Sequence, residues 1–199
     1  MSELDTPRQE VKSEMTKEKL ETLLRSHGVP LEKWGVGHAK TVEHLLAEVA
    51  SGESFLNIKD GQIVRDVISV AMSIYYQRGE EVLRLMEEKQ VFTDGHERVR
   101  NDLVSMGEKM NPGENPEDAM HRALREELKI EGLQSVIERP TIVEEIPSGS
   151  YPGIFSKHIR YRYDVVLQEK DFKPEGYVEV QPDKTTYFIW KKVDSIPGV

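Results

Sequence analysis

The chain has 199 residues, 37% of them hydrophobic and 32% charged, and it contains no cysteine, which excludes disulfide bonds, thiolate metal sites and cysteine nucleophiles. No apolar run approaches the ~20 residues that a membrane-spanning helix requires, so we expect no membrane segment. The formal net charge of -9 disfavours non-specific nucleic-acid binding, which depends on clustered lysine and arginine, but it is compatible with an anionic small molecule bound together with a divalent cation.

Three regions with different patterns follow one another along the chain. Residues 1–15 carry mixed charge and almost nothing to bury, so we expect a disordered tail. This segment resembles neither a secretory signal nor a transit peptide, and we therefore expect a cytoplasmic protein. Residues 16–62 contain two apolar stripes at helical spacing, which predict a small helical N-terminal element. Residues 64–199 switch between strand and helix patterns and form the main predicted domain.

The main domain begins with a predicted β-hairpin, because two apolar runs flank the turn signal at 77–80. Residues 93–102 are polar and predict a loop. The predicted strands lie at 67–76, 82–86, 103–106, 141–146, 159–167 and 185–193.

The segment 115–128 carries the clearest helix signal. Asn115 is a good N-cap, and Pro116 suits the first helical position. Met120, Leu124 and Leu128 recur every four residues and predict a face that packs on the core. We therefore predict an α/β fold in which the hairpin belongs to one mixed sheet and this helix is one of the helices that flank the sheet.

The residues around this helix resemble the Nudix box, the metal-binding motif of a superfamily of hydrolases. The family pattern is G-x5-E-x7-R-E-U-x-E-E-x-G-U, in which U is a bulky aliphatic residue. The matching positions are Glu114, Arg122, Leu124, Glu126, Glu127 and Ile130. Gly107 and Gly113 resemble the usual lead-in to the box. The resemblance implies a Nudix-type α/β/α sandwich with a mixed sheet, preceded here by the small helical element.

The box is degenerate at three positions. Glu108 stands where the first glycine belongs, Ala123 where the glutamate after the arginine belongs, and Lys129 where the second glycine belongs. Ala123 is the most consequential departure, because it removes one of the carboxylates that share a helix face and bind metal in the family. The change at Lys129 is milder, because Gly132 lies close enough to end the helix slightly later.

The resemblance also implies roles for the matching residues. Glu126 and Glu127 would hold Mg²⁺ or Mn²⁺ and act in catalysis, with weak or absent metal binding because of Ala123. Glu114 and Arg122, with Gly107 and Gly113, would maintain the loop before the helix. The candidates for a compensating carboxylate are Glu144, Glu145, Glu175 and Glu179.

Two further features are candidates for substrate binding. Tyr151 lies in the turn-rich loop 148–153, where a nucleotide base could stack on its ring, although a plain surface loop has the same composition. Arg160 and Arg162 alternate along a predicted strand and could meet phosphates, although an exposed strand face gives the same pattern.

The sequence leaves two functions open. One is a weakly active hydrolase that cleaves the pyrophosphate bond of a nucleoside diphosphate linked to another group. The other is a catalytically inactive Nudix-fold pseudoenzyme that binds a nucleotide, RNA or a protein partner. In both, the expected ligand is a nucleotide-like small molecule. A third hypothesis is that residues 16–62 are the functional part, as an element that docks a protein partner, and that the Nudix-like domain is a scaffold.

Overall fold

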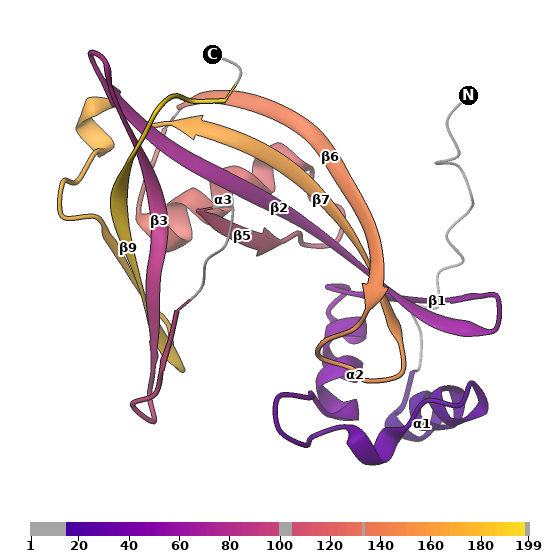
Figure 1. Cartoon of the computed structure of the whole chain (residues 1–199). Coiled ribbons are helices and arrows are strands. Elements are labelled where there is room, and N and C mark those ends of the chain that lie inside the picture. Colours follow the sequence, from indigo (N-terminus) through magenta and orange to yellow (C-terminus); the bar gives the residue numbers. More distant parts are fainter. Residues whose placement is uncertain (1–14, 100–104, 133, 198–199) are drawn as a thin grey trace, which may run out of the picture. The chain divides into compact units, whose positions relative to one another are not determined.

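The computed structural model describes residues 15–99, 105–132 and 134–197 (Figure 1). Its helices are α1 (Lys17–Ser26), α2 (Val42–Ala50), α3 (Pro116–Leu128) and the short 3-10 helices η1 (Leu31–Lys33) and η2 (Glu169–Asp171). Its strands are β1 (Phe55–Lys59), β2 (Gln62–Arg78), β3 (Glu81–Phe92), β4 (Glu97–Arg98), β5 (Met106–Lys109), β6 (Ser135–Pro147), β7 (Phe155–Val166), β8 (Tyr177–Val180) and β9 (Lys184–Val193). None of the described helices is long and apolar enough to cross a membrane.

The strands join in one sheet of order β6-β7-β2-β3-β9-β8, with β1 and β5 paired to β2 and β4 paired to β3. The predicted hairpin is formed by β2 and β3, which pair in antiparallel register from Tyr75 with Arg84 to Arg78 with Glu81. Figure 1 shows β7 running beside β2 in the same direction, so the sheet is mixed, as predicted. The predicted α/β fold class is confirmed.

The chain divides into two compact units. The first comprises Met1–Val67 and Glu144–Lys157, and the second comprises Ile68–Val143 and His158–Val199. The sequence predicts a single boundary between residues 62 and 64, which would assign Glu144–Lys157 to the main domain. In the structure this internal segment belongs to the first unit.

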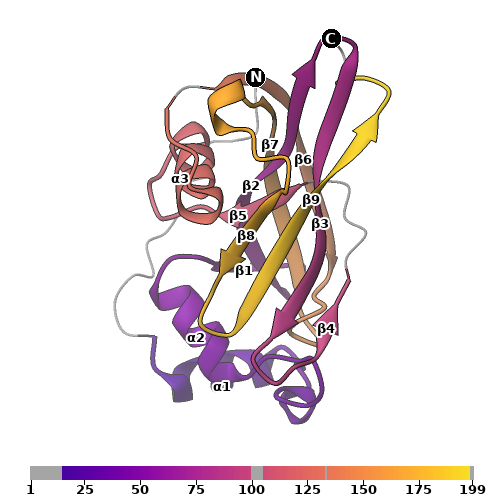
Figure 2. The ribbon, with the colours of Figure 1, turned by 90° about the vertical axis from the view of Figure 1, so that its left-hand side faces the viewer.

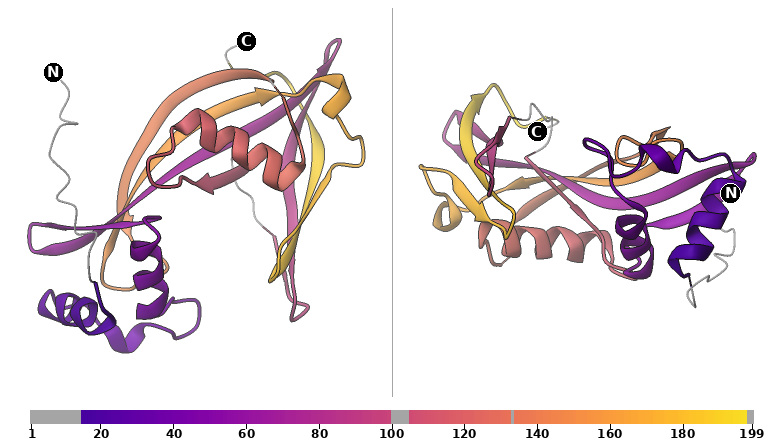
Figure 3. Two further views of the ribbon diagram at one scale, coloured as in Figure 1. Left: turned by 180° about the vertical axis from the view of Figure 1, so that it is seen from behind. Right: turned by 90° about the horizontal axis from the view of Figure 1, so that it is seen from below.

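The core of the second unit lies between α3 and the sheet. Helix α3 contacts β5 and β8 (Figure 3, left), and Figure 2 shows β8 lying next to β9. The predicted helix face, Met120, Leu124 and Leu128, is buried against residues such as Val70 of β2 and Val165 of β7. Each such side chain contributes roughly 1.5–3 kcal/mol by leaving water, so this face holds the helix in place.

The first unit has its own apolar core. Leu20 and Leu24 of α1 and Leu45 of α2 are fully buried, and they pack with residues that include Trp34 and Ile154. The N-caps that begin the two helices are the threonines Thr16 and Thr41.

Three expectations for loops and termini need correction. The element 16–62 is not wholly helical, because it contains β1, which pairs with β2 around a turn at Asp60 and Gly61. Both turn residues have positive φ, 50° and 76°, so this Asp-Gly pair was a readable hairpin signal. The expected loop 93–102 includes the short strand β4. In place of the expected strand 103–106, the structure has β5 at Met106–Lys109. Residues 103 and 104 of the expected strand and residues 1–14 of the expected tail lie outside the described residues.

Candidate active site at the end of the box helix

The loop before α3 is fixed by two residues of the degenerate box. Arg122 Nε donates to Glu114 Oε1 at 2.8 Å, and Arg122 Nη2 donates to Glu114 Oε2 at 3.0 Å. Arg122 Nη2 also donates to the carbonyl oxygen of Lys109, at 2.8 Å. The Glu114–Arg122 pair therefore joins the loop, the helix and β5.

The two motif glycines differ in how strictly their positions require glycine. Gly113 has φ of +77°, a left-handed conformation that side-chain-bearing residues rarely adopt. Gly107 lies in β5 opposite Ala71, and an added Cβ would meet the carbonyl oxygen of Val70 at 3.5 Å, which is ordinary contact. The loop therefore needs a glycine at 113, while packing alone does not demand one at 107.

Helix α3 begins and ends through local hydrogen bonds. The Asn115 side chain accepts from the backbone nitrogen of Asp118 at 2.8 Å, as expected for an N-cap. At the other end, Lys129 itself takes the left-handed conformation, with φ of 59° and ψ of 35°. The nitrogen of Ile130 then donates to the carbonyl oxygen of Leu124 at 3.1 Å, which closes the helix and buries Ile130. The expectation that Gly132 would end the helix is therefore wrong.

The carboxylates at the end of α3 point to different surroundings. Glu127 lies one turn beyond Ala123 on the same helix face, and Ala123 is buried in the core at 1% exposure. Glu126 is on the exposed side, where its Oε2 lies 3.5 Å from Arg122 Nη1. Glu126 and Glu127 therefore do not share one environment, although they are adjacent in sequence.

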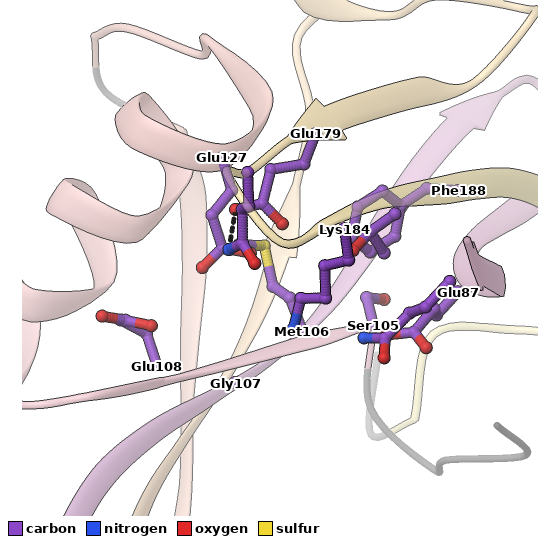
Figure 4. Close-up of a pocket in the computed structure, with 12 residues that line it drawn as sticks. Glu87, Ser105, Met106, Gly107, Glu108, Glu127, Glu179, Lys184 and Phe188 are labelled. Carbon is purple, nitrogen blue, oxygen red and sulfur yellow. Dashed lines mark hydrogen bonds between the residues drawn. The ribbon is translucent and has the colours of Figure 1, made fainter. Parts of the chain in front are cut away.

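Glu127 lines a pocket of about 160 Å³, which we call the acidic pocket (Figure 4). Its walls come from α3, β3, β5, β8 and β9, and all of them belong to the second unit. Its carboxylates are Glu87, Glu108, Glu127 and Glu179, and Lys184 is the one cation among its described lining residues. The other lining residues are Gln90, Ser105, Met106, Gly107, Gln181, Thr186 and Phe188.

The acidic pocket changes the ionisation of Glu127. The pKa of this carboxyl is raised from 4.5 to about 8, mainly by burial and then by the charges of Glu179 and Glu108, while Lys184 opposes this rise. Glu179 was one of the four candidates for a compensating carboxylate, and Figure 4 shows its side chain beside that of Glu127. Its carboxylate accepts a hydrogen bond from Gln181 Nε2 at 2.5 Å. Two further wall residues, Glu87 and Gln90, belong to no motif in the sequence.

The mixed sheet, the Glu114–Arg122 pair and the buried face of α3 are together the arrangement that the box resemblance implied. The likeness to the Nudix box is one of architecture, because the box itself departs from the pattern at Ala123.

Comparison with known proteins found similarity in structure only. No protein-family model matches the chain, and no curated protein sequence matches it. The NUDIX domain of Shewanella oneidensis NrtR, solved with ADP ribose, is 10% identical, with 64% of this chain and 73% of that chain covered and a TM-score of 0.41. The C. elegans Ap4A hydrolase is 12% identical, with 63% of this chain and 79% of that chain covered and a TM-score of 0.34. A NUDIX hydrolase from Nitrosomonas europaea is 17% identical, with 61% of this chain and 71% of that chain covered and a TM-score of 0.30. At such values the likeness says nothing about the activity or substrate of this chain.

The acidic pocket fits a divalent cation only in part. Carboxylate oxygens are the ligands that Mg²⁺ and Mn²⁺ prefer, and Glu108, Glu127 and Glu179 reach the pocket from three separate segments. Within residues 15–99, 105–132 and 134–197, however, no three His, Cys, Asp or Glu side chains stand close enough together to hold an ion. An ion in this arrangement would have at most two such protein ligands and water for the rest.

The predicted substrate-binding residues are not among those that line the acidic pocket. Tyr151 is fully buried in the core of the first unit, with its ring 5.0 Å from that of Trp34 and 5.2 Å from the guanidinium of Arg65. A base could stack on Tyr151 only after this core opened. Arg160 and Arg162 are half-buried on β7 and do not line the pocket, so their contact with phosphates remains a prediction.

Proposed function

We propose that this chain is a Nudix-type hydrolase that cleaves, slowly, the pyrophosphate bond of a nucleoside diphosphate linked to another group. The observation that carries the proposal is the position of Glu127, which reaches from the end of the box helix into a pocket lined by Glu108 and Glu179. Like charges close together and partly buried are unfavourable alone and favour a bound cation.

In the proposed reaction Glu127 accepts the proton of the attacking water. A general base works best when its pKa lies near the working pH, and the pKa of Glu127 is raised to about 8. When bound, Mg²⁺ or Mn²⁺ would neutralise charge on the diphosphate and orient the water. Glu126, which is exposed and lies next to Arg122, is proposed to act at most from the rim.

A specific observation favours a second function. Ala123 offers no oxygen on the helix face that it shares with Glu127, and its side chain is part of the core. A module that binds a nucleotide-like small molecule, RNA or protein without cleaving it would tolerate this loss. A protein partner for residues 16–62 and a cytoplasmic location are also proposals.

The experiment is a release assay with a panel of nucleoside diphosphate compounds in Mg²⁺ or Mn²⁺. Slow, metal-dependent product release that Glu127→Gln abolishes supports the hydrolase. Glu126→Gln, which removes a neighbouring charge on the exposed side of α3, is the matched control and should retain most activity. Binding of these compounds without any Glu127-dependent release would refute the hydrolase and favour the non-cleaving module.

A further inference from the structure

One wall of the acidic pocket is shaped by an irregularity in the sheet. The pairing of β3 with β9 shifts register between Glu87 and Lys89: Glu87 lies opposite Phe188, and Gln90 lies opposite Thr186. In a regular strand residues three apart point to opposite faces, but the extra residue places Glu87 and Gln90 on one face. We call Glu87, Gln90, Thr186 and Phe188 the β3–β9 patch, and all four side chains line the pocket.

The β3–β9 patch contains buried polar atoms without partners. Gln90 is 4% exposed and Thr186 is 2% exposed, yet Gln90 Oε1 and Thr186 Oγ1 have no hydrogen-bond partner among the described residues. The hydroxyl of Ser105, in the same pocket, instead donates to the carbonyl oxygen of Leu85 and accepts from the nitrogen of Ile74. An unsatisfied buried polar atom is destabilising, so two of them facing one pocket point to a ligand.

The orientation of the Gln90 amide determines what that ligand must supply. Gln90 Nε2 donates to Glu87 Oε2 at 3.3 Å, and a carboxylate can only accept, so the amide nitrogen faces Glu87 and its oxygen is the free atom. A carboxylate has about four acceptor sites, so Glu87 can accept further hydrogen bonds beside this one. The patch therefore presents two neighbouring acceptors to the pocket, and its best complement is a pair of adjacent N–H donors.

Among the nucleobases, this requirement selects one. Guanine carries a ring N1–H next to its N2 amino group, whereas adenine and cytosine place an amino donor next to a ring acceptor, and uracil places its N–H between two carbonyls. Phe188 and Met106 add apolar lining suited to a flat ring.

We propose that the β3–β9 patch binds the donor edge of a guanine base, and that the ligand of the acidic pocket is a guanine nucleotide derivative. This inference rests on the proposed function, since it assigns the base of the same substrate. In the bound arrangement the N–H groups donate to Gln90 Oε1 and to the carboxylate of Glu87, and the Thr186 hydroxyl joins the same network.

The test is a nuclear magnetic resonance titration of the full chain with guanosine, inosine and adenosine, without metal. Inosine lacks the amino group of guanosine, so it should bind about tenfold more weakly, and adenosine at least as weakly as inosine. Thr186→Val is nearly isosteric and should weaken guanosine binding about threefold or more without lowering the melting temperature, because the hydroxyl has no partner to lose. Thr185→Val, one residue away on the other face of β9, is the matched control and should leave binding unchanged.

Equal binding of the three nucleosides, no binding of guanosine, or guanosine binding that Thr186→Val leaves intact would each overturn the proposal. The titration contains neither phosphate nor metal, so its failure would leave the hydrolase proposal standing. Conversely, if no diphosphate compound is cleaved but guanosine binds selectively, the hydrolase proposal fails and the base assignment holds for a non-cleaving module.

Discussion

Glu114 and Arg122 meet in a two-point contact, with Nε on Oε1 at 2.8 Å and Nη2 on Oε2 at 3.0 Å, although eight residues separate them. Their side chains are only 13% and 15% exposed. The contact lowers the pKa of Glu114, and the backbone nitrogen of Asn111 also donates to this carboxylate. Paired charged groups of this kind are among the stronger hydrogen bonds in proteins, so this contact should matter for stability.

Replacement of Arg122 by alanine should destabilise the fold. It leaves the Glu114 carboxylate without its main partner, and we expect a loss of about 1.5–3 kcal/mol in the free energy of unfolding. Arg125→Ala removes an exposed arginine from the same helix and should cost less than about 0.5 kcal/mol. Chemical denaturation of both variants measures the difference, and equal losses would show that the pair does not stabilise the loop.

Replacement of Lys129 by glycine should stabilise the protein. The left-handed conformation at the end of α3 is strained for a residue with a Cβ, and we expect a gain of roughly 0.5–1 kcal/mol once that atom is removed. The Lys129 ammonium donates to the carbonyl oxygen of Glu126 at 2.8 Å, an exposed contact that opposes this gain slightly. Lys129→Ala loses that contact and keeps the Cβ, so it should show no gain in the same denaturation experiment.

The features that sequence predicted well are those set by near neighbours in the chain. Asn115, Pro116 and the apolar face of α3 act within one helix, and the spacing of Glu114 and Arg122 spans a single loop and two turns. For the same reason the β2–β3 hairpin was readable from its turn and its two apolar runs. Local chemistry is therefore enough to locate the box and its architecture.

The features that sequence did not predict depend on pairing between distant segments. The shift that brings Gln90 opposite Thr186, 96 positions further along the chain, arises from the register of β3 on β9, and the sequence of either strand alone does not indicate it. Glu179 could be named as a candidate, but only the structure places it beside Glu127. Tyr151 seemed available in a turn-rich loop, and it is buried because that loop packs into the core of the first unit.

The raised pKa of Glu127 should make stability depend on pH in a defined window. Below about pH 4.5 this carboxyl is protonated in both folded and unfolded chains, and above about pH 8 it is ionised in both. Between these values the folded chain keeps a proton that the unfolded chain has lost, so its stability falls as pH rises, by up to about 1.4 kcal/mol per pH unit.

Glu127→Gln removes this titration. The variant should match the parent near pH 4 and be the more stable of the two at pH 8, because the amide stays neutral in the buried site. Melting curves across this range, with Glu126→Gln as the control for loss of an exposed charge, measure the effect. A parent chain whose stability relative to Glu127→Gln does not change between pH 4 and pH 8 would contradict the assigned environment of Glu127.

Restoration of the missing box carboxylate should create a metal-dependent gain in stability. Ala123→Glu places a second carboxylate one turn before Glu127, on a face where Ala123 is buried. Without metal the larger, charged side chain should destabilise the fold by about 1–3 kcal/mol, because it is overpacked and lies near a like charge. Mn²⁺ should recover part of this loss, since an ion that binds only the folded chain raises stability in proportion to the logarithm of its concentration.

The matched control for this variant is Ala123→Gln, which has the same size and no charge. It should lose stability by overpacking alone and gain nothing from Mn²⁺, so the difference between the two melting temperatures, with and without Mn²⁺, isolates metal binding. Under the proposed function Ala123→Glu should also increase product release in a Glu127-dependent way, whereas Ala123→Glu combined with Glu127→Gln should remain inactive. If the Glu and Gln variants respond identically to Mn²⁺, the end of α3 keeps the architecture of the box without its affinity for metal, and the non-cleaving module becomes the better account of this chain.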